Sequence, residues 1–209
     1  MLGILDYGVG NLFSLKSSLS ALGAESIVSA DMRHLESCSA LILPGVGAFE
    51  KAAKLLSDSG LADFTVRRVE AGIPLLGICL GMQMLFEKSY EYGEHAGLGL
   101  IPGVVRPISD VIPAELKIPH IGWNALCFPA ARPKSALFSE VEPGECVYFV
   151  HSYYANTSSA YISATAEYGA PLTAAVERGC VYGCQFHPEK SGPVGLRILR
   201  AFCKLGGVL

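Results

Sequence analysis

The chain has 209 residues, which is enough for one domain with a full hydrophobic core. Hydrophobic residues make up 51% and charged residues 17% of the chain, a composition that excludes disorder and is typical of a folded globular protein. Its 19 acidic and 16 basic residues are scattered along the sequence and form no basic stripe suited to phosphates. We therefore expect a single domain over residues 1–209 that binds no nucleic acid.

The start of the chain goes directly into strand-like sequence, without the basic segment and apolar stretch of an export signal. No apolar run approaches the length that crosses a bilayer. Seven cysteines are an odd number in a chain that needs no disulfides for stability, which favours free thiols in a reducing compartment. Cys180 and Cys184 lack the second pair or nearby histidines of a zinc site, so we expect core positions for them. The sequence predicts a cytoplasmic protein with no membrane association, no metal and no cofactor.

The first half of the chain alternates short apolar runs with helical periodicity, a pattern typical of a parallel sheet flanked by helices. Leucines spaced three and four residues apart predict an amphipathic helix over residues 11–22. A second helix is predicted over about residues 49–71. A third follows the strand that ends at residue 78, with Met82, Leu85 and Phe86 on its apolar face. The predicted strands of this half are residues 2–5, 26–28, 40–43 and 75–78.

The second half contains many β-branched and aromatic residues separated by glycine, proline and polar turns. This pattern predicts an antiparallel or mixed extension of the sheet. A closing helix over residues 194–205 is predicted because Leu196, Leu199 and Phe202 share one face. The strand candidates of this half are residues 104–105, 118–126, 147–150, 161–166 and 181–186.

Cys79 directly follows the apolar run of residues 75–78, at a turn flanked by Gly77 and Gly81. A side chain on a sharp strand-to-helix turn projects from the end of the sheet, and glycines remove the side chains that would crowd the bend. The positive end of the following helix favours a thiolate. In open α/β sheets, sites form at such strand ends. Cys79 is therefore a candidate nucleophile, although a cysteine after a strand is more often a small core residue.

A candidate base lies late in the chain, in the segment His187-Pro188-Glu189. Pro188 is placed to turn the chain so that the carboxylate of Glu189 reaches the imidazole of His187, which it would orient and stabilise when charged. A nucleophile, a base and an orienting carboxylate together suit amide hydrolysis through a thioester. Taken singly, His187 would be interpreted as a turn histidine and Glu189 as a surface charge. His34, His95 and His120 have no such context and are expected to be structural or surface residues.

Residues 44–47 form a glycine-rich run, Pro-Gly-Val-Gly, at the end of another predicted strand, and they lack the lysine pattern of a phosphate-binding loop. Thioester chemistry passes through oxyanions, which backbone amides stabilise. The amide of Leu80 is one candidate donor because it directly follows Cys79, and Val46 or Gly47 is a candidate for the second. A glycine-rich tetrapeptide is also compatible with a plain turn.

With these residues identified, the chain resembles the class I, triad-type glutamine amidotransferases. Residues 77–83, Gly-Ile-Cys-Leu-Gly-Met-Gln, are similar to the nucleophile motif of that superfamily, and the segment around His187 and Glu189 is similar to its histidine and glutamate. The resemblance implies the flavodoxin-like fold of class I glutaminases and hydrolysis of L-glutamine to L-glutamate and ammonia by Cys79, His187 and Glu189. Four further segments resemble the glutaminase subunits of imidazole glycerol phosphate synthases: residues 6–12, 43–49, 119–124 and 186–191.

The same resemblance implies a binding site for glutamine. Its contacts would come from Gly47, Gln83, Glu91, His151, Ser152 and Tyr153. A carboxylate such as Glu91 suits the ammonium group of the substrate, and amide donors suit its carboxylate. Without the resemblance, Glu91 would be interpreted as a solvent-facing acid at a helix end.

The resemblance also implies a partner, the (β/α)8 cyclase subunit of imidazole glycerol phosphate synthase, which receives the ammonia in histidine biosynthesis. Asn11, Trp123 and Lys190 lie in the segments that distinguish this subfamily, so the resemblance suggests that they face the cyclase. An exposed tryptophan beside a lysine suits an interface anchor, although Trp123 is equally compatible with a core position. Because the chain ends soon after its last predicted helix, we expect the cyclase to be another polypeptide and the pair to form a heterodimer.

Two alternatives stay open at this point. The glutaminase subunit of another synthase, such as anthranilate or aminodeoxychorismate synthase, would share Cys79, His187 and Glu189 and differ at the partner interface. A non-catalytic regulatory or scaffold subunit would keep only the fold, and the presence of all three residues argues against it.

Overall fold

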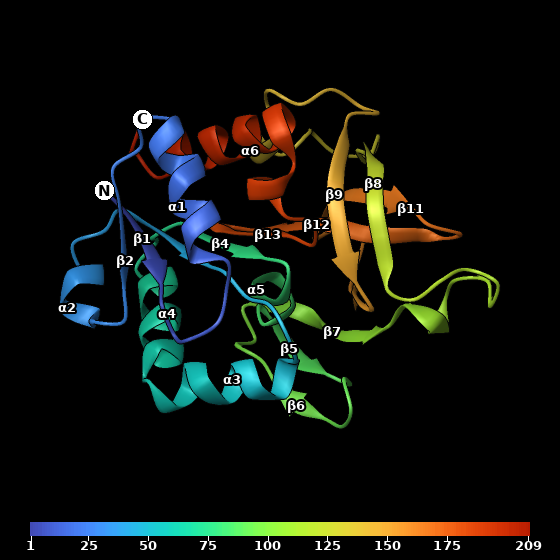
Figure 1. Cartoon of the computed structure of the whole chain (residues 1–209), viewed down its shortest axis with the longest axis horizontal. Coiled ribbons are helices and arrows are strands. Elements are labelled where there is room, and N and C mark those ends of the chain that lie inside the picture. The colour runs from blue at the N-terminus through green and yellow to red at the C-terminus, as the bar shows by residue number, and fades with distance from the viewer.

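A nine-stranded mixed sheet forms the centre of the computed structural model, which describes residues 1–209 (Figure 1). Its strands are β1 (Leu2–Leu5), β2 (Ser26–Ser29), β3 (Ala40–Leu43), β4 (Leu75–Ile78), β8 (His120–Cys127), β9 (Cys146–His151), β11 (Ile162–Glu167), β12 (Pro171–Arg178) and β13 (Val181–Cys184). Their order is β2-β1-β3-β4-β13-β12-β11-β8-β9. Pairing is parallel from β2 to β13 and antiparallel from β13 to β9. The predicted parallel first half and mixed second half are therefore confirmed.

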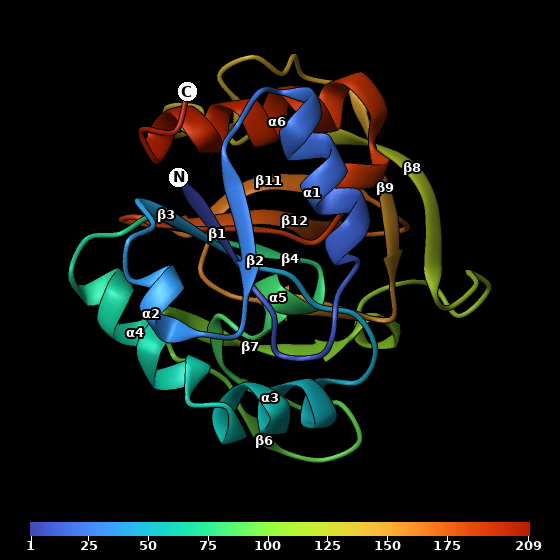
Figure 2. The same ribbon diagram turned by 60° about the vertical axis from the view of Figure 1, so that its left-hand side comes forward.

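Helices cover both faces of the parallel part of the sheet. The α-helices are α1 (Leu12–Ala21), α2 (Met32–Leu35), α3 (Phe49–Asp58), α4 (Leu61–Glu70), α5 (Leu80–Gln83) and α6 (Gly192–Leu205). Figures 1 and 2 show α1 and α6 together on one side of the sheet, and α2, α3 and α4 on the other. Strands β1, β3, β4 and β13 are buried at every residue because they are covered on both faces. This arrangement explains why their sequences are short continuous apolar runs.

A second, four-stranded sheet lies on the same side of the large sheet as α3 (Figures 1 and 2). Its strands are β5 (Phe86–Ser89), β6 (His95–Ala96), β7 (Ile101–Pro107) and β10 (Tyr153–Asn156), in the order β10-β7-β5-β6. Phe86 and Ile101 of this sheet belong to the same buried cluster as Phe49 of α3 and Phe64 of α4. Three short 3-10 helices complete the chain: η1 (Ile108–Asp110), η2 (Ala136–Phe138) and η3 (Pro188–Lys190).

Two predicted helices differ from the structure. The helix expected over residues 49–71 is two helices, because Gly60 takes a left-handed conformation with φ 74° and turns the chain between α3 and α4. The helix expected after Cys79 is the single turn α5, and Phe86 begins strand β5 instead of continuing that helix. The apolar residues of this segment do not mark one helix face, because Met82, Leu85 and Phe86 are all buried in the same cluster although they span α5 and β5. Apolar spacing therefore did not distinguish a helix from a buried turn followed by a strand.

The sequence prediction also omitted elements and merged the two sheets. Helix α2 and strands β5, β6, β10 and β12 were not predicted, and the strand expected at residues 104–105 is part of β7 in the second sheet. Strand β12 lies in the interior of the large sheet between β11 and β13. Its residues Leu172–Val176 are buried, and the alanines among them have little strand preference of their own.

None of the helices combines the length and the apolar character needed to cross a bilayer.

Candidate active site

Cys79 stands at a sharp turn between β4 and α5. Its backbone has φ 56° and ψ −112°, one of only two non-glycine residues with positive φ in the chain. A Cβ on Gly81 would lie 1.9 Å from the carbonyl oxygen of Leu43, and one on Gly77 would lie 2.6 Å from the carbonyl oxygen of Gly81. The two flanking glycines are therefore required for this close approach of the backbone. The structure places Cys79 at the strained strand-to-helix turn that the sequence predicted.

His187 reaches Cys79 because β13 pairs in parallel with β4. Cys184 lies opposite Ile78 in the register, and the backbone N–H of Cys79 donates to the carbonyl of Cys184 at 2.7 Å. The carboxyl ends of the two strands therefore lie side by side, and Cys79 follows β4 by one residue whereas His187 follows β13 by three. Residues 79 and 187 are distant in sequence, and this pairing is what brings them together.

Glu189 folds back onto His187 through the 3-10 turn η3. Nδ1 of His187 donates to Oε1 of Glu189 at 2.8 Å, and both side chains are only 3% exposed. A carboxylate can only accept, so the proton sits on Nδ1 and Nε2 is left for Cys79. Pro188 begins η3, as expected from its position in the sequence. The nucleophile, base and carboxylate are thus assembled in one buried cluster.

The environment of His187 favours its charged form. Burial lowers its pKa, but hydrogen bonds with Cys79 and Glu189 and the negative charges of both outweigh burial and raise the pKa to about 9. His187 is therefore an imidazolium at neutral pH. In that form it can give a proton to a leaving amine, and afterwards, as a neutral imidazole, it can take one from water.

The glycine-rich loop of residues 44–47 lies against the turn that carries Cys79. A Cβ on Gly45 would be 2.8 Å from the amide nitrogen of Gly81 and 2.9 Å from the hydroxyl of Tyr7. That hydroxyl donates to the carbonyl of Pro44 at 2.6 Å and is buried. Val46 and Gly47 border the same pocket as Cys79 and Leu80. The candidate oxyanion donors from the two loops therefore border the same cavity.

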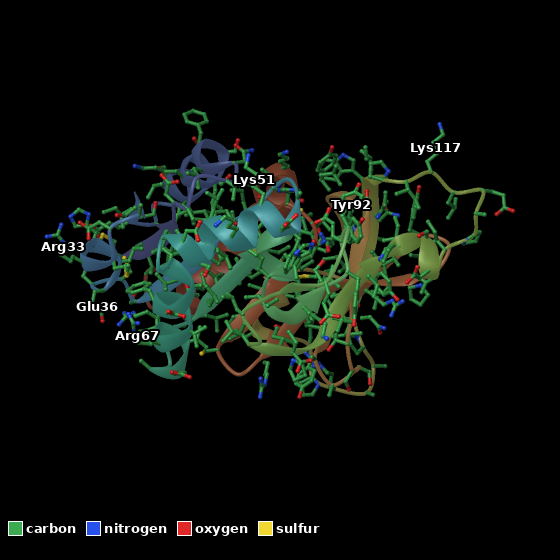
Figure 3. All side chains as sticks on the ribbon, turned by 90° about the horizontal axis from the view of Figure 1, so that it is seen from below. Arg33, Glu36, Lys51, Arg67, Tyr92 and Lys117 are labelled. Atoms are coloured by element: carbon green, nitrogen blue, oxygen red, sulfur yellow. The ribbon has the colours of Figure 1, made fainter.

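A cavity of about 530 Å³ opens above Cys79. Besides Cys79, Leu80 and His187, it is lined by every residue predicted to contact glutamine: Gly47, Gln83, Glu91, His151, Ser152 and Tyr153. Val46, a candidate oxyanion donor, also lines the cavity. The remaining lining residues were not identified as site residues from the sequence: Tyr92, Pro107, Ser109, Ile118, Pro119 and Val150. Figure 3 shows Tyr92 between α3, which carries Lys51, and the loop that carries Lys117. These wall residues come from β7, η1, β9 and the loops before β6 and β8, so they are far apart in the sequence, and only Pro119 lies in one of the segments that carry the family resemblance.

Glu91 has a structural contact as well as a place in the pocket. Its Oε2 accepts from the backbone N–H of Phe49 at 2.5 Å, and so caps helix α3, whose own N-cap residue provides no side-chain bond. Glu91 lies in the loop between β5 and β6, not at a helix end of its own. The contact fixes the carboxylate at the edge of the cavity with Oε1 available to a ligand.

His151 differs from His187 in charge. Its Nδ1 lies 2.8 Å from the carbonyl oxygen of Tyr153, and its Nε2 lies 3.0 Å from Nδ1 of the buried His120. Burial lowers the pKa of His151 to about 4, so the ring is neutral at pH 7. His120 is a buried structural residue, stacked on Tyr168 and Phe149. It therefore holds His151 in the pocket wall.

The three residues predicted to face a partner lie on the outside of this site. Trp123 is 56% exposed on β8, which excludes the core position. Its ring centroid lies 5.9 Å from that of Tyr148, and Nζ of Lys190 lies 5.9 Å from the same Tyr148 ring. Asn11 caps α1 and borders a small cavity next to Glu189. Trp123 and Lys190 thus share one surface, and Asn11 lies close behind the triad.

The model of the family described as glutamine amidotransferase class-I matches residues 3–205, and the chain belongs to the class I glutamine amidotransferases. A solved structure titled crystal structure of glutamine amidotransferase superposes with a TM-score of 0.76 at 26% identity, covering 99% of each chain.

Two curated relatives are imidazole glycerol phosphate synthase subunits named HisH. The protein from Streptococcus sanguinis strain SK36 is 48% identical over 202 residues, which cover 97% of this chain and 95% of that protein. The protein from Geobacillus kaustophilus strain HTA426 is 48% identical over 205 residues, with the same coverage of both chains. The predicted resemblance to this subfamily is therefore confirmed over nearly the whole chain.

Proposed function

We propose that this chain is the glutaminase subunit of an imidazole glycerol phosphate synthase and hydrolyses L-glutamine to L-glutamate and ammonia. The observation that supports this function best is that Cys79 and His187, the latter hydrogen-bonded to Glu189, line one cavity together with all six predicted glutamine contacts. The HisH names of the relatives point to the same synthase.

The first half of the reaction forms a thioester. The sulfur of Cys79 attacks the amide carbon of glutamine, and the carbonyl electron pair moves to oxygen, where the amide of Leu80 and that of Val46 or Gly47 donate to it. The imidazolium of His187 gives its proton to the amide nitrogen, so that the C–N bond breaks and ammonia leaves. The carboxylate of Glu189 keeps the imidazole in place throughout.

The second half releases glutamate. Neutral His187 takes a proton from water, whose oxygen attacks the thioester carbon to form a second oxyanion. As this oxyanion collapses, the C–S bond breaks and its electron pair returns to the sulfur of Cys79. The proton from water remains on His187, and the site is restored.

The ammonia is proposed to pass to a separate (β/α)8 cyclase subunit in a heterodimer. Trp123 and Lys190 support a docking surface here, because a tryptophan that is 56% exposed beside a lysine is a typical interface anchor. Asn11 would join this interface from the rim of the triad. The relatives are named as subunits, which supports a partner encoded separately.

We further propose that the chain acts as one domain over residues 1–209 in the cytoplasm. All seven cysteines are free thiols in the structure, which suits a reducing compartment.

Glutamate release tests the function. The purified chain and its Cys79→Ala variant are assayed with glutamine, each with and without a cyclase subunit that carries its nucleotide ligand. We expect release that requires both Cys79 and the liganded cyclase. Equal release by the Cys79→Ala variant would reject the thioester mechanism, and release that ignores the cyclase would reject the coupling.

A further inference from the structure

Gln185 is a buried amide next to the nucleophile that the triad does not explain. It lies between β13 and His187, and its side chain has no exposed surface. Its Nε2 lies 3.8 Å from Sγ of Cys79, within hydrogen-bond range for sulfur. Burial of an amide costs free energy unless its polar atoms are paired. The contact with the sulfur pairs the buried NH₂ group of Gln185.

Two further hydrogen bonds determine which end of the amide faces the sulfur. Gln83 donates from Nε2 to the backbone carbonyl of Tyr153 at 3.2 Å and to Oε1 of Gln185 at 3.0 Å. A carbonyl can only accept, so the nitrogen end of Gln83 must point toward Tyr153 and Gln185. Gln185 then presents its oxygen to Gln83 and its NH₂ group to Cys79. The opposite orientation would set two NH₂ groups against each other and an oxygen against the sulfur.

The backbone holds this chain of amides in place. The N–H of Gln185 donates to Ala174 of β12 at 2.8 Å, and the neighbouring carbonyl of Cys184 accepts from Cys79. Both the amide and the sulfur are therefore anchored on adjacent strands of the sheet. A donor held on such a scaffold needs little reorganisation when charge develops on the sulfur.

We propose that Gln185 is a further catalytic residue, whose Nε2 hydrogen donates to the sulfur of Cys79 whenever that sulfur carries negative charge. This role rests on the proposed glutaminase function. The donor stabilises the sulfur before it attacks, loses strength while the sulfur is bonded to carbon in the thioester, and recovers it as the C–S bond breaks. An amide that donates to an anion forms a stronger hydrogen bond than one between neutral groups.

The test replaces the amide with an apolar chain of the same length. In Gln185→Met, Gln83 keeps its bond to Tyr153, and only the donor to sulfur and its partner are lost. We expect kcat for glutamine hydrolysis in the cyclase complex to fall about tenfold to a hundredfold, with KM changed by less than about twofold. In the isolated full chain, we expect the pH midpoint for alkylation of Cys79 by iodoacetamide, mapped by mass spectrometry, to rise by about one pH unit.

A matched control separates this effect from general loss of a buried polar bond. Thr173 is buried on the adjacent strand β12, where its Oγ1 donates to the carbonyl of Ala155 at 2.8 Å. Thr173→Val removes a buried side-chain hydrogen bond without touching the site, and should lower the thermal midpoint while leaving the alkylation profile and kcat unchanged. A Gln185→Met variant that behaves in the same way as Thr173→Val would overturn the proposal.

A second variant keeps the proposal testable if Gln185→Met does not fold. Gln185→Glu has the same shape, accepts from Gln83 and places an anionic oxygen against the sulfur. We expect slower alkylation of Cys79 near neutral pH and a loss of kcat at least as large as in Gln185→Met. Wild-type alkylation and turnover in Gln185→Glu would overturn the proposal. The alkylation profile needs neither glutamine nor the cyclase, so a failed glutaminase assay with the expected alkylation shift would count against the proposed function and not against this contact.

Discussion

His187 and His151 lie in the walls of the same cavity and are both buried, yet they carry different charges at neutral pH. The pKa of His187 is raised to about 9, and that of His151 is lowered to about 4. Burial disfavours the charged form in both cases. The difference comes from their partners, since His187 meets the carboxylate of Glu189 and the sulfur of Cys79, whereas His151 meets a carbonyl and a second histidine.

The comparison shows that the partner, and not the depth of burial, assigns each histidine its role. One ring can exchange protons with the reacting groups, and the other is a neutral part of the wall that keeps the same state throughout the physiological pH range. A site with two charged histidines would repel itself, because the charge on His187 already disfavours one on His151.

The largest expected effect follows from removing the carboxylate that distinguishes the two histidines. Glu189→Gln keeps the shape of the side chain but takes away its charge and permits the wrong tautomer of His187. We expect kcat for glutamine hydrolysis to fall by about 10³- to 10⁴-fold, by analogy with loss of the orienting acid in other triads. Steady-state kinetics of the cyclase complex measures this. A loss below about tenfold would mean that Glu189 does not orient the base.

The second prediction concerns stability in acid. The pKa of His151 is lower in the folded chain than the usual value of 6.5, so its contribution to stability is present above about pH 6.5 and is lost as the pH falls toward 4. That loss amounts to at most about 3 kcal/mol. His151→Asn keeps a donor near Tyr153 and should show a flatter decline, measured by urea denaturation between pH 7 and 4. His34→Asn, at an exposed position, should behave like wild type. Parallel curves for His151→Asn and wild type would contradict the lowered pKa.

The third prediction concerns alkaline pH. The pKa of His187 is raised in the folded chain, so its contribution to stability is complete below about pH 6.5 and is lost as the pH rises through 9. A loss of at most about 3 kcal/mol is expected over this window, reduced by solvent in the open cavity. Glu189→Gln should lessen the decline between pH 6.5 and 9 in the same denaturation experiment. If the variant and wild type lose stability equally over that window, the pair does not hold the proton.

The smallest expected effect concerns the support of His120. Oδ1 of Asn124 lies 2.7 Å from Nε2 of His120, and Nδ2 of Asn124 donates to the carbonyl of Glu167 at 2.8 Å. Asn124→Ala removes both contacts at a partly exposed position, which should cost about 1 kcal/mol of unfolding free energy with little change in kcat. Denaturation at pH 7 and the glutaminase assay measure the two quantities. A large loss of kcat would show that this edge of the wall acts on the chemistry.

Local sequence was sufficient for the parts of the site that depend on neighbours in the chain. Glycines around Cys79 predicted its turn, and Pro188 predicted the turn that brings Glu189 back to His187. The prediction was wrong at residues 49–71, where Gly60 ends one helix and precedes another, and after Cys79, where a uniformly buried segment shows no distinguishing period. Strand β12 was omitted because its alanines have little strand preference of their own, and pairing with β11 and β13 holds them in the sheet.

The amino-acid sequence by itself determined the strand-forming runs, the chemical groups of the site and the family to which the chain belongs, because these depend on residue types and on spacing over a few residues. Only the tertiary structure decided that β13 lies beside β4 and so joins His187 to Cys79, that Trp123 is exposed, and that the amide of Gln185 faces the sulfur. It also decided which histidine is charged. These properties depend on distances and desolvation between segments far apart in the chain, which local spacing does not encode.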